Sequence, residues 1–380
     1  MADSLTFGSA AWMSGEEYGG EYAVRIKQFI NKIDEKALLS YASSLRGEQP
    51  CTISPEFSVG SFNLVHKIQF NDGVEWVARL QMPPIRDGGS VMVSPATQER
   101  MILDMQSELA TMEFVRQNTG ITIPRVYAYD LNGQNDVGCP FSIIEYVDGN
   151  TAEEVSRNYP GEHEGIPAQF EEKLVETGTG PHNTAAEFYA DYPLALSRSL
   201  GEQPVSGQDE LMQAFRSLAA SFPSDGSGEG FGLANYDLNL NNILVDREFN
   251  VLTVIDWDFV VSVPDAALYR FPFLMGVSCA VPGVVDAHSK VIKQEQLRRR
   301  FAEVVEEVAQ QQAGKDCEGA NKLHKHLFTR SGFFSKEAVA FRSLIRVKMR
   351  QDWVNDTWLR GLKWLSQHDE MQVAQFYLPG

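Results

Sequence analysis

Residues 235–258 constrain the fold of this chain more than any other segment. They contain, in order, Asp237, Asn242, an apolar strand, a polar turn, a second apolar strand and Asp256. Two apolar strands joined by a short turn form a hairpin, so we expect the three polar side chains to lie towards one end of the strands. A carboxylate that orients an attacking group, together with an amide and a carboxylate that hold magnesium against phosphates, is the set that phosphoryl transfer from a nucleotide requires.

The same segment fits two other patterns. Positions one, three, five and twelve of a calcium-binding loop are matched by Asp237, Asn239, Asn241 and Glu248. Such a loop needs a helix on each side, whereas glycines precede this segment and residues 251–255 have the composition of a strand, so calcium binding is a distant alternative. The other pattern is a set of turn and cap residues, which explains each polar residue singly but not the three at this spacing.

The rest of the chain divides into a strand-rich part and a helical part, which indicates an α+β fold with two lobes. We expect a helical arm over residues 1–47, an N-lobe over 48–148 and a mostly helical C-lobe over 149–380 that contains the hairpin 235–258. Apolar runs between turn signals predict strands at 57–59, 64–70, 76–80, 125–129 and 141–146. Helical periodicity predicts helices at 99–118, 185–200, 209–221, 286–312, 320–330, 335–348 and 350–377.

Two charged residues interrupt apolar patterns in the first part of the chain. Arg79 stands near the end of an apolar strand, and Glu108 falls on the apolar stripe of the helix at 99–118. A charge that faces an apolar seam is costly unless it is paired, so we expect an ion pair between them. The alternative places Glu108 at the edge of the stripe, in water.

The turn that contains Gly60 and Ser61 joins two predicted strands and is able to present backbone N–H groups to phosphates, although most such turns are only hairpins.

The composition restricts the classes of partner. The formal net charge is −18, with 33 Lys and Arg against 51 Asp and Glu, which argues against nucleic acids and anionic membranes as partners. The start of the chain has no basic region followed by an apolar block, and the sequence has no apolar run long enough to span a bilayer, so we expect a cytoplasmic protein. The four cysteines form no CxxC pair and the seven histidines form no zinc motif, so we expect reduced thiols and structural histidines.

Several of these segments together resemble the aminoglycoside phosphotransferase/choline kinase-like family, and the chain looks most like its fungal branch. These are small-molecule kinases with the protein-kinase fold. The resemblance covers about residues 55–275. It rests on Val77-Ala78-Arg79-Leu80, Glu108 in its helix, residues 144–149, residues 237–245 and Val254-Ile255-Asp256-Trp257-Asp258. The last two blocks are fairly specific when they occur together; the first is not.

The resemblance implies a role for each matching position. Asp237 would orient or deprotonate the acceptor hydroxyl, and Asn242 and Asp256 would bind Mg²⁺. Arg79 would contact the phosphates of ATP and be anchored by Glu108. Backbone groups of Glu145, Tyr146 and Val147 would hold adenine, and the turn at Gly60 and Ser61 would lie near the phosphates. The helical C-lobe would form the pocket for a small acceptor, which in this family is often a cationic or polyol compound.

Three features depart from the family pattern. Asn235 stands where the family commonly has His, Arg79 stands where it has Lys, and residues 150–182 are shorter and less helical than expected. Arginine keeps its charge and binds phosphate through a bidentate fork, so the phosphate contact is able to survive. The departures leave an alternative open, namely a kinase-shaped binding or scaffold protein without turnover. The sequence does not determine the acceptor or the oligomeric state.

Overall fold

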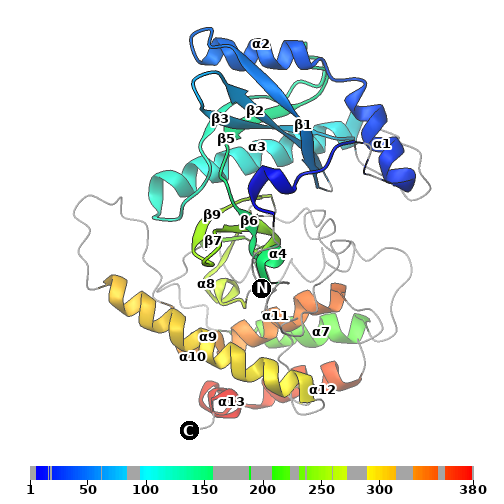
Figure 1. The fold of residues 1–380 in the computed structure, drawn as a ribbon. Coiled ribbons are helices and arrows are strands. Elements are labelled where there is room, and N and C mark those ends of the chain that lie inside the picture. Colours follow the sequence, from blue (N-terminus) through cyan, green and yellow to red (C-terminus); the bar gives the residue numbers. More distant parts are fainter. Residues whose placement is uncertain are drawn as a thin grey trace. The chain divides into compact units, whose positions relative to one another are not determined.

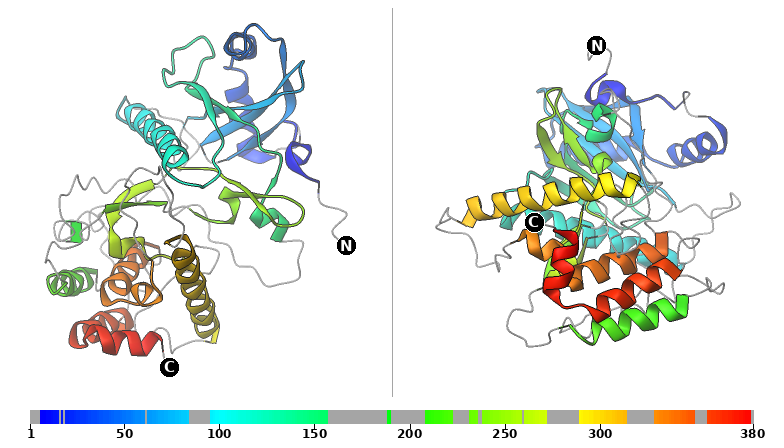
Figure 2. Two further views of the ribbon diagram at one scale, coloured as in Figure 1. Left: turned by 90° about the vertical axis from the view of Figure 1, so that its left-hand side faces the viewer. Right: turned by 90° about the horizontal axis from the view of Figure 1, so that it is seen from below.

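The computed structural model describes residues 6–15, 17, 19–60, 62–83, 95–156, 188–189, 208–222, 231–235, 238–258, 260–271, 289–313, 328–349 and 356–378. Contacts between residues divide the chain into two units. The first unit combines Met1–Glu162 with Leu240–Asp258, and the second combines His163–Asn239 with Phe259–Gly380. Figures 1 and 2 show the helices and strands of each unit.

The first unit is built on a five-stranded antiparallel sheet with the strand order β1-β2-β3-β5-β4. These strands are β1 (Cys51–Val59), β2 (Asn63–Phe70), β3 (Glu75–Gln81), β4 (Val126–Asp130) and β5 (Phe141–Glu145). The connection between β2 and β3 is a tight turn at Asn71-Asp72-Gly73, where Gly73 has a φ of 85° that glycine adopts without strain. The long β1 corrects the prediction of a strand over 57–59 only. A register shift between Ile53 and Phe57, beside Pro55, interrupts the alternation that marks a strand.

One face of this sheet forms an apolar core with two helices, α1 (Gly20–Ile30) and α2 (Glu35–Leu45). The helix α2 begins at Asp34, whose side chain accepts a hydrogen bond from Ala37 N. Within β3, Ala78 and Leu80 belong to this core. Because successive strand residues point to opposite faces, Arg79 is directed to the other face of the sheet. The predicted helix at 99–118 is α3 (Pro95–Asn118), which contacts β4.

A second, three-stranded sheet of the first unit has the order β6-β8-β9. It comprises β6 (Asn150–Thr151), β8 (Ile243–Val245) and β9 (Val251–Val254). The short helix α4 (Ala152–Ser156) follows β6, and the short helix η3 (Leu240–Asn242) precedes β8. The pairs Ile243–Val254 and Leu244–Thr253 show that the predicted hairpin forms. Gly149 directly precedes this sheet, and a Cβ there would lie only 3.0 Å from the carbonyl oxygen of Val245, so the close approach of the backbone favours glycine.

The second unit is mainly helical. Its described strands, β7 (Phe231–Asn235) and β10 (Val260–Pro264), pair with each other. Its described helices are α7 (Gln208–Ala219), α8 (Asp265–Leu268), α9 (Ser289–Ala313), α10 (Arg330–Phe333), α11 (Lys336–Met349), α12 (Asp356–Gln367) and α13 (Glu370–Tyr377). Their apolar faces meet in one core rich in Phe and Tyr. None of the described helices in either unit has both the length and the apolar character that crossing a membrane requires.

Two helix boundaries of the second unit differ from the prediction. The helix predicted over 350–377 is two helices, because Asp369 forms a capping box with Gln372 and thereby starts α13. The helix predicted over 320–330 falls mostly outside the described residues, and α10 begins only after Thr329, whose side chain accepts from Gly332 N. The helix predicted at 185–200 also lies almost entirely outside them. The α+β class is confirmed, while the division at residues 47 and 148 stays a prediction.

Candidate functional site

The β8–β9 hairpin brings Asn242 and Asp256 to one end of its strands. Asn242 ends η3 directly before β8, and its carbonyl accepts a hydrogen bond of 2.9 Å from Ile255 N, the residue before Asp256. The Asn242 side chain is buried. Asp237, predicted to orient the acceptor, lies outside the described residues, so its position stays a prediction. The strands at 231–235 and 251–254 stand where a calcium loop would need helices, which removes that alternative.

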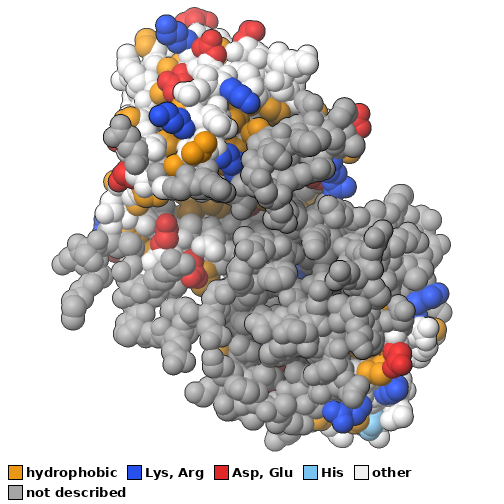
Figure 3. All heavy atoms as spheres, turned by 90° about the vertical axis from the view of Figure 1, so that its right-hand side faces the viewer, with side chains coloured by type: hydrophobic (Ala, Val, Ile, Leu, Met, Phe, Trp, Pro, Cys, Tyr) orange, Lys and Arg blue, Asp and Glu red, His pale blue; other side chains and the backbone are white. Residues whose placement is uncertain are grey.

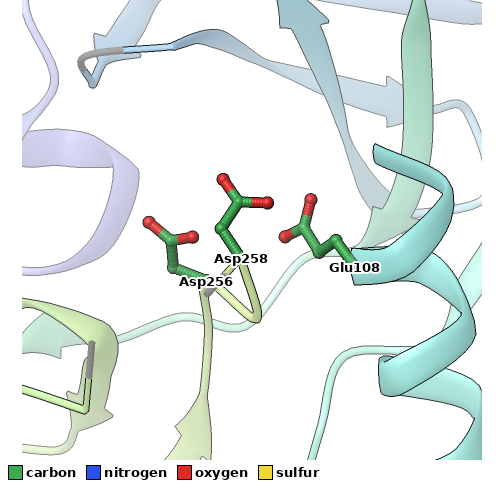
Figure 4. A group of neighbouring side chains, drawn as sticks. All are labelled: Glu108, Asp256 and Asp258. Carbon is green, nitrogen blue, oxygen red and sulfur yellow. The ribbon is translucent and has the colours of Figure 1, made fainter. Parts of the chain in front are cut away.

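The backbone after β9 turns sharply at Asp256. This residue has a φ of 59°, in the left-handed region that Asp adopts more readily than most residues. The turn directs Trp257 N towards Glu108 Oε1, at 3.4 Å, and Trp257 itself is buried, with its indole N–H donating to Val254 O at 3.0 Å. One residue further, Asp258 joins the group. Single carboxylate oxygens of Glu108, Asp256 and Asp258 lie within 4.8 Å of one another, and Figure 4 shows the three side chains.

Arg79 and Glu108 form the predicted ion pair. The distance from Arg79 Nη1 to Glu108 Oε1 is 2.5 Å, and the side chains are 13% and 5% exposed. Met105, Leu109, Met112 and Val115 of the same helix are buried, so Glu108 does lie on the apolar side of α3 and not at a wet edge. Glu108 Oε1 thus accepts from both Arg79 of β3 and the backbone of the Asp256 turn. It links the sheet, the helix and the hairpin within one unit.

The electrostatics of this group follow from three acids around one base. Burial raises the pKa of the Asp258 carboxyl well above its usual range; the charges of Glu108 and Asp256 add to this, while Arg79 opposes it. For Arg79, burial alone would lower the pKa, but the charges of Glu108, Asp256 and Asp258 outweigh burial and raise it. The described part of this group therefore holds more negative than positive charge, which favours a cation.

The predicted phosphate turn is only partly described. Gly60 is exposed, and its backbone N–H donates to Asn63 O at 2.9 Å, which closes the turn between β1 and β2. Ser61 lies outside the described residues. The contribution of this turn to phosphate binding stays a prediction.

The predicted adenine-binding segment follows β5. Glu145 ends that strand, and its backbone N–H donates to Arg125 O at 2.8 Å. Tyr146 is half-buried; its hydroxyl donates to Asp148 Oδ1 at 2.8 Å and accepts from Ser9 N at 2.9 Å. Lys67 Nζ lies 5.1 Å from the centre of the Tyr146 ring. The backbone from Glu145 to Asn150, called the hinge below, is therefore held by contacts with several other segments of the chain.

A model of the phosphotransferase enzyme family matches residues 63–264, more than half of the 380 residues. The chain belongs to that family. This confirms the resemblance that the motifs indicated, and the matched range contains Arg79, Glu108, Asn242, Asp256 and Asp258.

Individual proteins resemble this phosphotransferase family member at low sequence identity. A Candida dubliniensis protein named "Altered inheritance of mitochondria protein 9, mitochondrial" is 29% identical over 129 residues, which cover 30% of this chain and 18% of that protein. A relative of the same name from Zygosaccharomyces rouxii is 31% identical over 90 residues, or 24% of this chain and 13% of its own length. Among solved structures, an ethanolamine kinase of Plasmodium vivax aligns over 96% of this chain and 94% of its own, with 12% identity and a TM-score of 0.42.

The curated relatives correct one expectation. The sequence led us to expect a cytoplasmic protein, but these relatives carry the word "mitochondrial" in their names. That finding overturns the expectation, which rested on the lack of a secretory pattern and of a membrane-spanning apolar run. The chain spans less than a fifth of the length of the curated relatives that it matches.

The structure adds Asp258 to the residues that the sequence singled out. Asp258 belongs to a motif that matches the family, but no role was predicted for it from the sequence. A detectable signal was present, because a second carboxylate two residues after Asp256 follows the same strand. Residues two apart in an extended chain share a face, but the left-handed turn at Asp256 is what brings this carboxylate back towards Glu108, and that turn has no unambiguous sequence signature.

Proposed function

We propose that this protein is an ATP- and Mg²⁺-dependent phosphotransferase that acts on a hydroxyl group of a small molecule. The observation that supports the proposal is the clustering of the Asp256 and Asp258 carboxylates with the Arg79–Glu108 pair within one unit. The backbone carbonyl of Asn242 accepts from Ile255 N, next to Asp256. Membership of the phosphotransferase enzyme family supports the same reaction. The acceptor class, a cationic or polyol compound, follows only from the resemblance.

The donor atoms present suit magnesium. Mg²⁺ prefers carboxylate, carbonyl and phosphate oxygens, and it usually uses only one or two protein carboxylates together with the phosphates of a substrate. We assign Asn242 and Asp256 as its protein ligands and add Asp258 to them. Mg²⁺ bound to ATP would neutralise charge on the phosphates. Arg79, whose charge the surrounding acids preserve, would contact those phosphates, since its fixed fork matches phosphate oxygens.

Catalysis would then depend mainly on position. The transferred phosphoryl group carries spread negative charge in its transition state, so aligned cations and an oriented hydroxyl supply most of the rate enhancement. In this proposal the acceptor oxygen forms a bond to the γ-phosphorus while the bond to the bridging oxygen of ADP breaks. Asp237 would orient the hydroxyl group and take its proton.

The first test is Mg-dependent nucleotide binding by the purified chain. We expect ATP with Mg²⁺ to raise the thermal unfolding midpoint, and ATP with EDTA to raise it much less, because the acids at the site repel bare phosphates. Asp256→Ala should abolish the Mg-dependent part of this rise in the unfolding midpoint. Glu248→Ala removes an exposed acid from the turn of the same hairpin and serves as the matched control, with a wild-type response.

Turnover is tested separately with a panel of small alcohols, amino alcohols and polyols coupled to ADP release. Asp237→Ala should reduce turnover and leave nucleotide binding intact. A wild-type protein that shows no Mg-dependent nucleotide response contradicts the proposal at its base. Mg-dependent binding with no transfer to any acceptor would instead favour the kinase-shaped binding protein, an alternative motivated by Asn235 in place of the usual His.

We also propose a mitochondrial location, which the names of the curated relatives support. Expression of the tagged chain in yeast, followed by fractionation, tests it. We expect the tag to co-purify with mitochondria and to be protected from added protease. A tag found wholly in the soluble fraction contradicts this proposal.

A further inference from the structure

The segment Thr6–Met13, called the strap below, contacts the hinge. It contains the short helix η1 (Gly8–Ala11), drawn in dark blue in Figure 1. Ser9 N donates to the Tyr146 hydroxyl at 2.9 Å, and the Trp12 ring meets the Tyr146 ring edge to face, with 6.3 Å between ring centres. Tyr146 is one of the residues assigned to adenine binding. Its side chain is therefore fixed from outside the hinge by a distant part of the chain.

A second set of contacts joins the strap to the end of the hinge. Asn150 is buried, and its side chain accepts from Gly8 N at 2.7 Å and donates to Thr6 O at 3.1 Å. Both hydrogen-bonding groups of this amide are thus used by the strap. Asn150 also pairs with Val245 in the sheet that carries the proposed metal ligands. A buried amide satisfied in this way fixes register strongly, because an unmade bond there would leave a buried polar group without a partner.

The strap continues to the strand that leads into the phosphate turn. Met13 N donates to Phe57 O at 3.3 Å and Phe57 N donates to Met13 O at 3.0 Å, a short antiparallel bridge on β1. At the other end of the strap, Phe7 packs on the apolar cluster around Val245 and lies under the Arg247 guanidinium, 4.5 Å from the ring centre. One segment thereby connects β1, the hinge and the β6-β8-β9 sheet. All of these belong to the first unit.

Gly8 is the residue that permits this close contact. Its φ is 60°, and a Cβ at this position would lie 1.8 Å from Asp148 Oδ1 and 2.9 Å from the Tyr146 hydroxyl oxygen. Any side chain here would have to displace the carboxylate that accepts from Tyr146. Gly15, in the same part of the chain, would place a Cβ at an ordinary 3.6 Å from Phe57 and so provides a matched control.

On the face of the first unit that Figure 3 shows, the charged side chains do not gather in a patch of one sign. Figure 3 shows acidic, basic and apolar side chains interspersed on the visible face of its described part, without one dominant sign of charge. The concentrated polar interactions of the strap are directed inward, to Tyr146 and Asn150.

We propose that the strap is a positioning element of the nucleotide site, which holds the hinge in the conformation that binds adenine and so sets the affinity for ATP. This inference rests on the proposed function for the identity of the ligand. It predicts that a substitution at Gly8, which contacts the hinge, weakens binding at the adenine end of the nucleotide more than at the phosphate end. The phosphate end is proposed to depend on Arg79, Asn242 and Asp256, whereas the hydrogen bonds of the strap described above go to Tyr146, Asn150 and Phe57.

The experiment compares Gly8→Ala with Gly15→Ala in the full chain, using two probes. The first is ATP with Mg²⁺, and the second is inorganic tripolyphosphate with Mg²⁺, which has no adenine. For Gly8→Ala we expect a loss of about tenfold in affinity for ATP, or ~1.4 kcal/mol, and a change below about twofold for tripolyphosphate. Gly15→Ala should change neither. A third variant, Tyr146→Phe, removes only the hydroxyl and should also weaken ATP binding and spare tripolyphosphate.

Hydrogen exchange at residues 146–150 provides a readout that does not need a ligand. We expect faster exchange in Gly8→Ala than in Gly15→Ala at equal circular dichroism. The proposed role of the strap is overturned if Gly8→Ala and Gly15→Ala bind ATP with equal affinity, or if Gly8→Ala loses as much affinity for tripolyphosphate as for ATP. If the wild type binds no nucleotide, the proposed function fails; the role of the strap is then tested by hydrogen exchange alone, and equal exchange rates in Gly8→Ala and Gly15→Ala would overturn it. If Gly8→Ala does not fold, the affinities of Tyr146→Phe for ATP and tripolyphosphate test the proposal instead.

Discussion

Glu108 shows how a single side chain determines whether the proposed site is assembled. Its Oε1 atom accepts from Arg79 and from Trp257 N, so the same oxygen fixes a guanidinium and the backbone next to Asp256. Asp256 itself has a left-handed backbone, which persists only where its surroundings hold it. The Arg79 and Glu108 side chains are both largely buried, so breaking this interaction affects stability as well as binding.

We expect Glu108→Ala to lower the free energy of unfolding by about 2 kcal/mol, below the ~3–5 kcal/mol typical when one partner of a buried pair is removed, because Asp256 and Asp258 remain beside Arg79. Urea unfolding of the magnesium-free protein measures it. Glu113→Ala, which removes an exposed acid from the same helix, is the control and should have a much smaller effect. Equal shifts in the two variants would show that Glu108 is not a buried partner.

His66 gives the first unit a predictable sensitivity to acid. Burial lowers its pKa from the usual 6.5 to about 4, although a hydrogen bond with Ser54 O acts in the opposite direction. The unfolded chain therefore binds this proton more readily, so the stability contributed by neutral His66 is complete above about pH 6.5 and is lost as the pH falls towards 4. His66→Gln should have a flatter stability profile over this window in urea unfolding. His368→Gln is the control, and an unchanged slope in His66→Gln would contradict the assignment.

At the scale of elements, the β8–β9 hairpin determines how the proposed metal ligands are presented. Its turn is organised by Asp246, whose carboxylate accepts from Glu248 N at 2.9 Å and from Asn250 N and Nδ2 at 2.8 Å each. These bonds lower the pKa of Asp246, the Asn250 side-chain bond most of all. The turn lies at the opposite end of the hairpin from Asn242 and Asp256, so it affects the ligands only through the register of the strands.

We therefore expect Asp246→Ala to weaken Mg-dependent ATP binding without removing any proposed ligand. The loss should be smaller than that of Asp256→Ala and larger than that of Glu248→Ala, since Glu248 contributes only its backbone N–H to the turn bonds. Calorimetric titration of the three variants with ATP and Mg²⁺ gives the order. Binding by Asp246→Ala that equals the wild type would show that the hairpin keeps its register without this turn.

Across the whole molecule, the sequence predicted those features that depend on residues near one another in the chain or on a clear apolar pattern. The apolar pattern of β3 and the apolar stripe of α3 each contain one charged residue. Burying either charge alone costs free energy, and an ion pair between them lowers that cost, so the contact between Arg79 and Glu108 was predictable from the sequence. The hairpin followed from two apolar runs and a turn. The strap did not, because Thr6–Met13 has no periodicity and the bond from Gly8 to Asn150 spans 142 positions of the chain. The role of Asp258 also depended on a backbone angle that the sequence does not specify.

The first unit is assembled from two stretches of chain, Met1–Glu162 and Leu240–Asp258. On a ribosome, which releases the N-terminal part of a protein first, its five-stranded sheet emerges well before the hairpin. Asp256 and Asp258, the proposed acidic ligands, are made only after His163–Asn239 has been translated. A nascent chain would thus hold an incomplete form of the proposed magnesium site for much of its synthesis. On the proposed function, a ribosome stalled before residue 258 would carry a chain unable to retain the nucleotide.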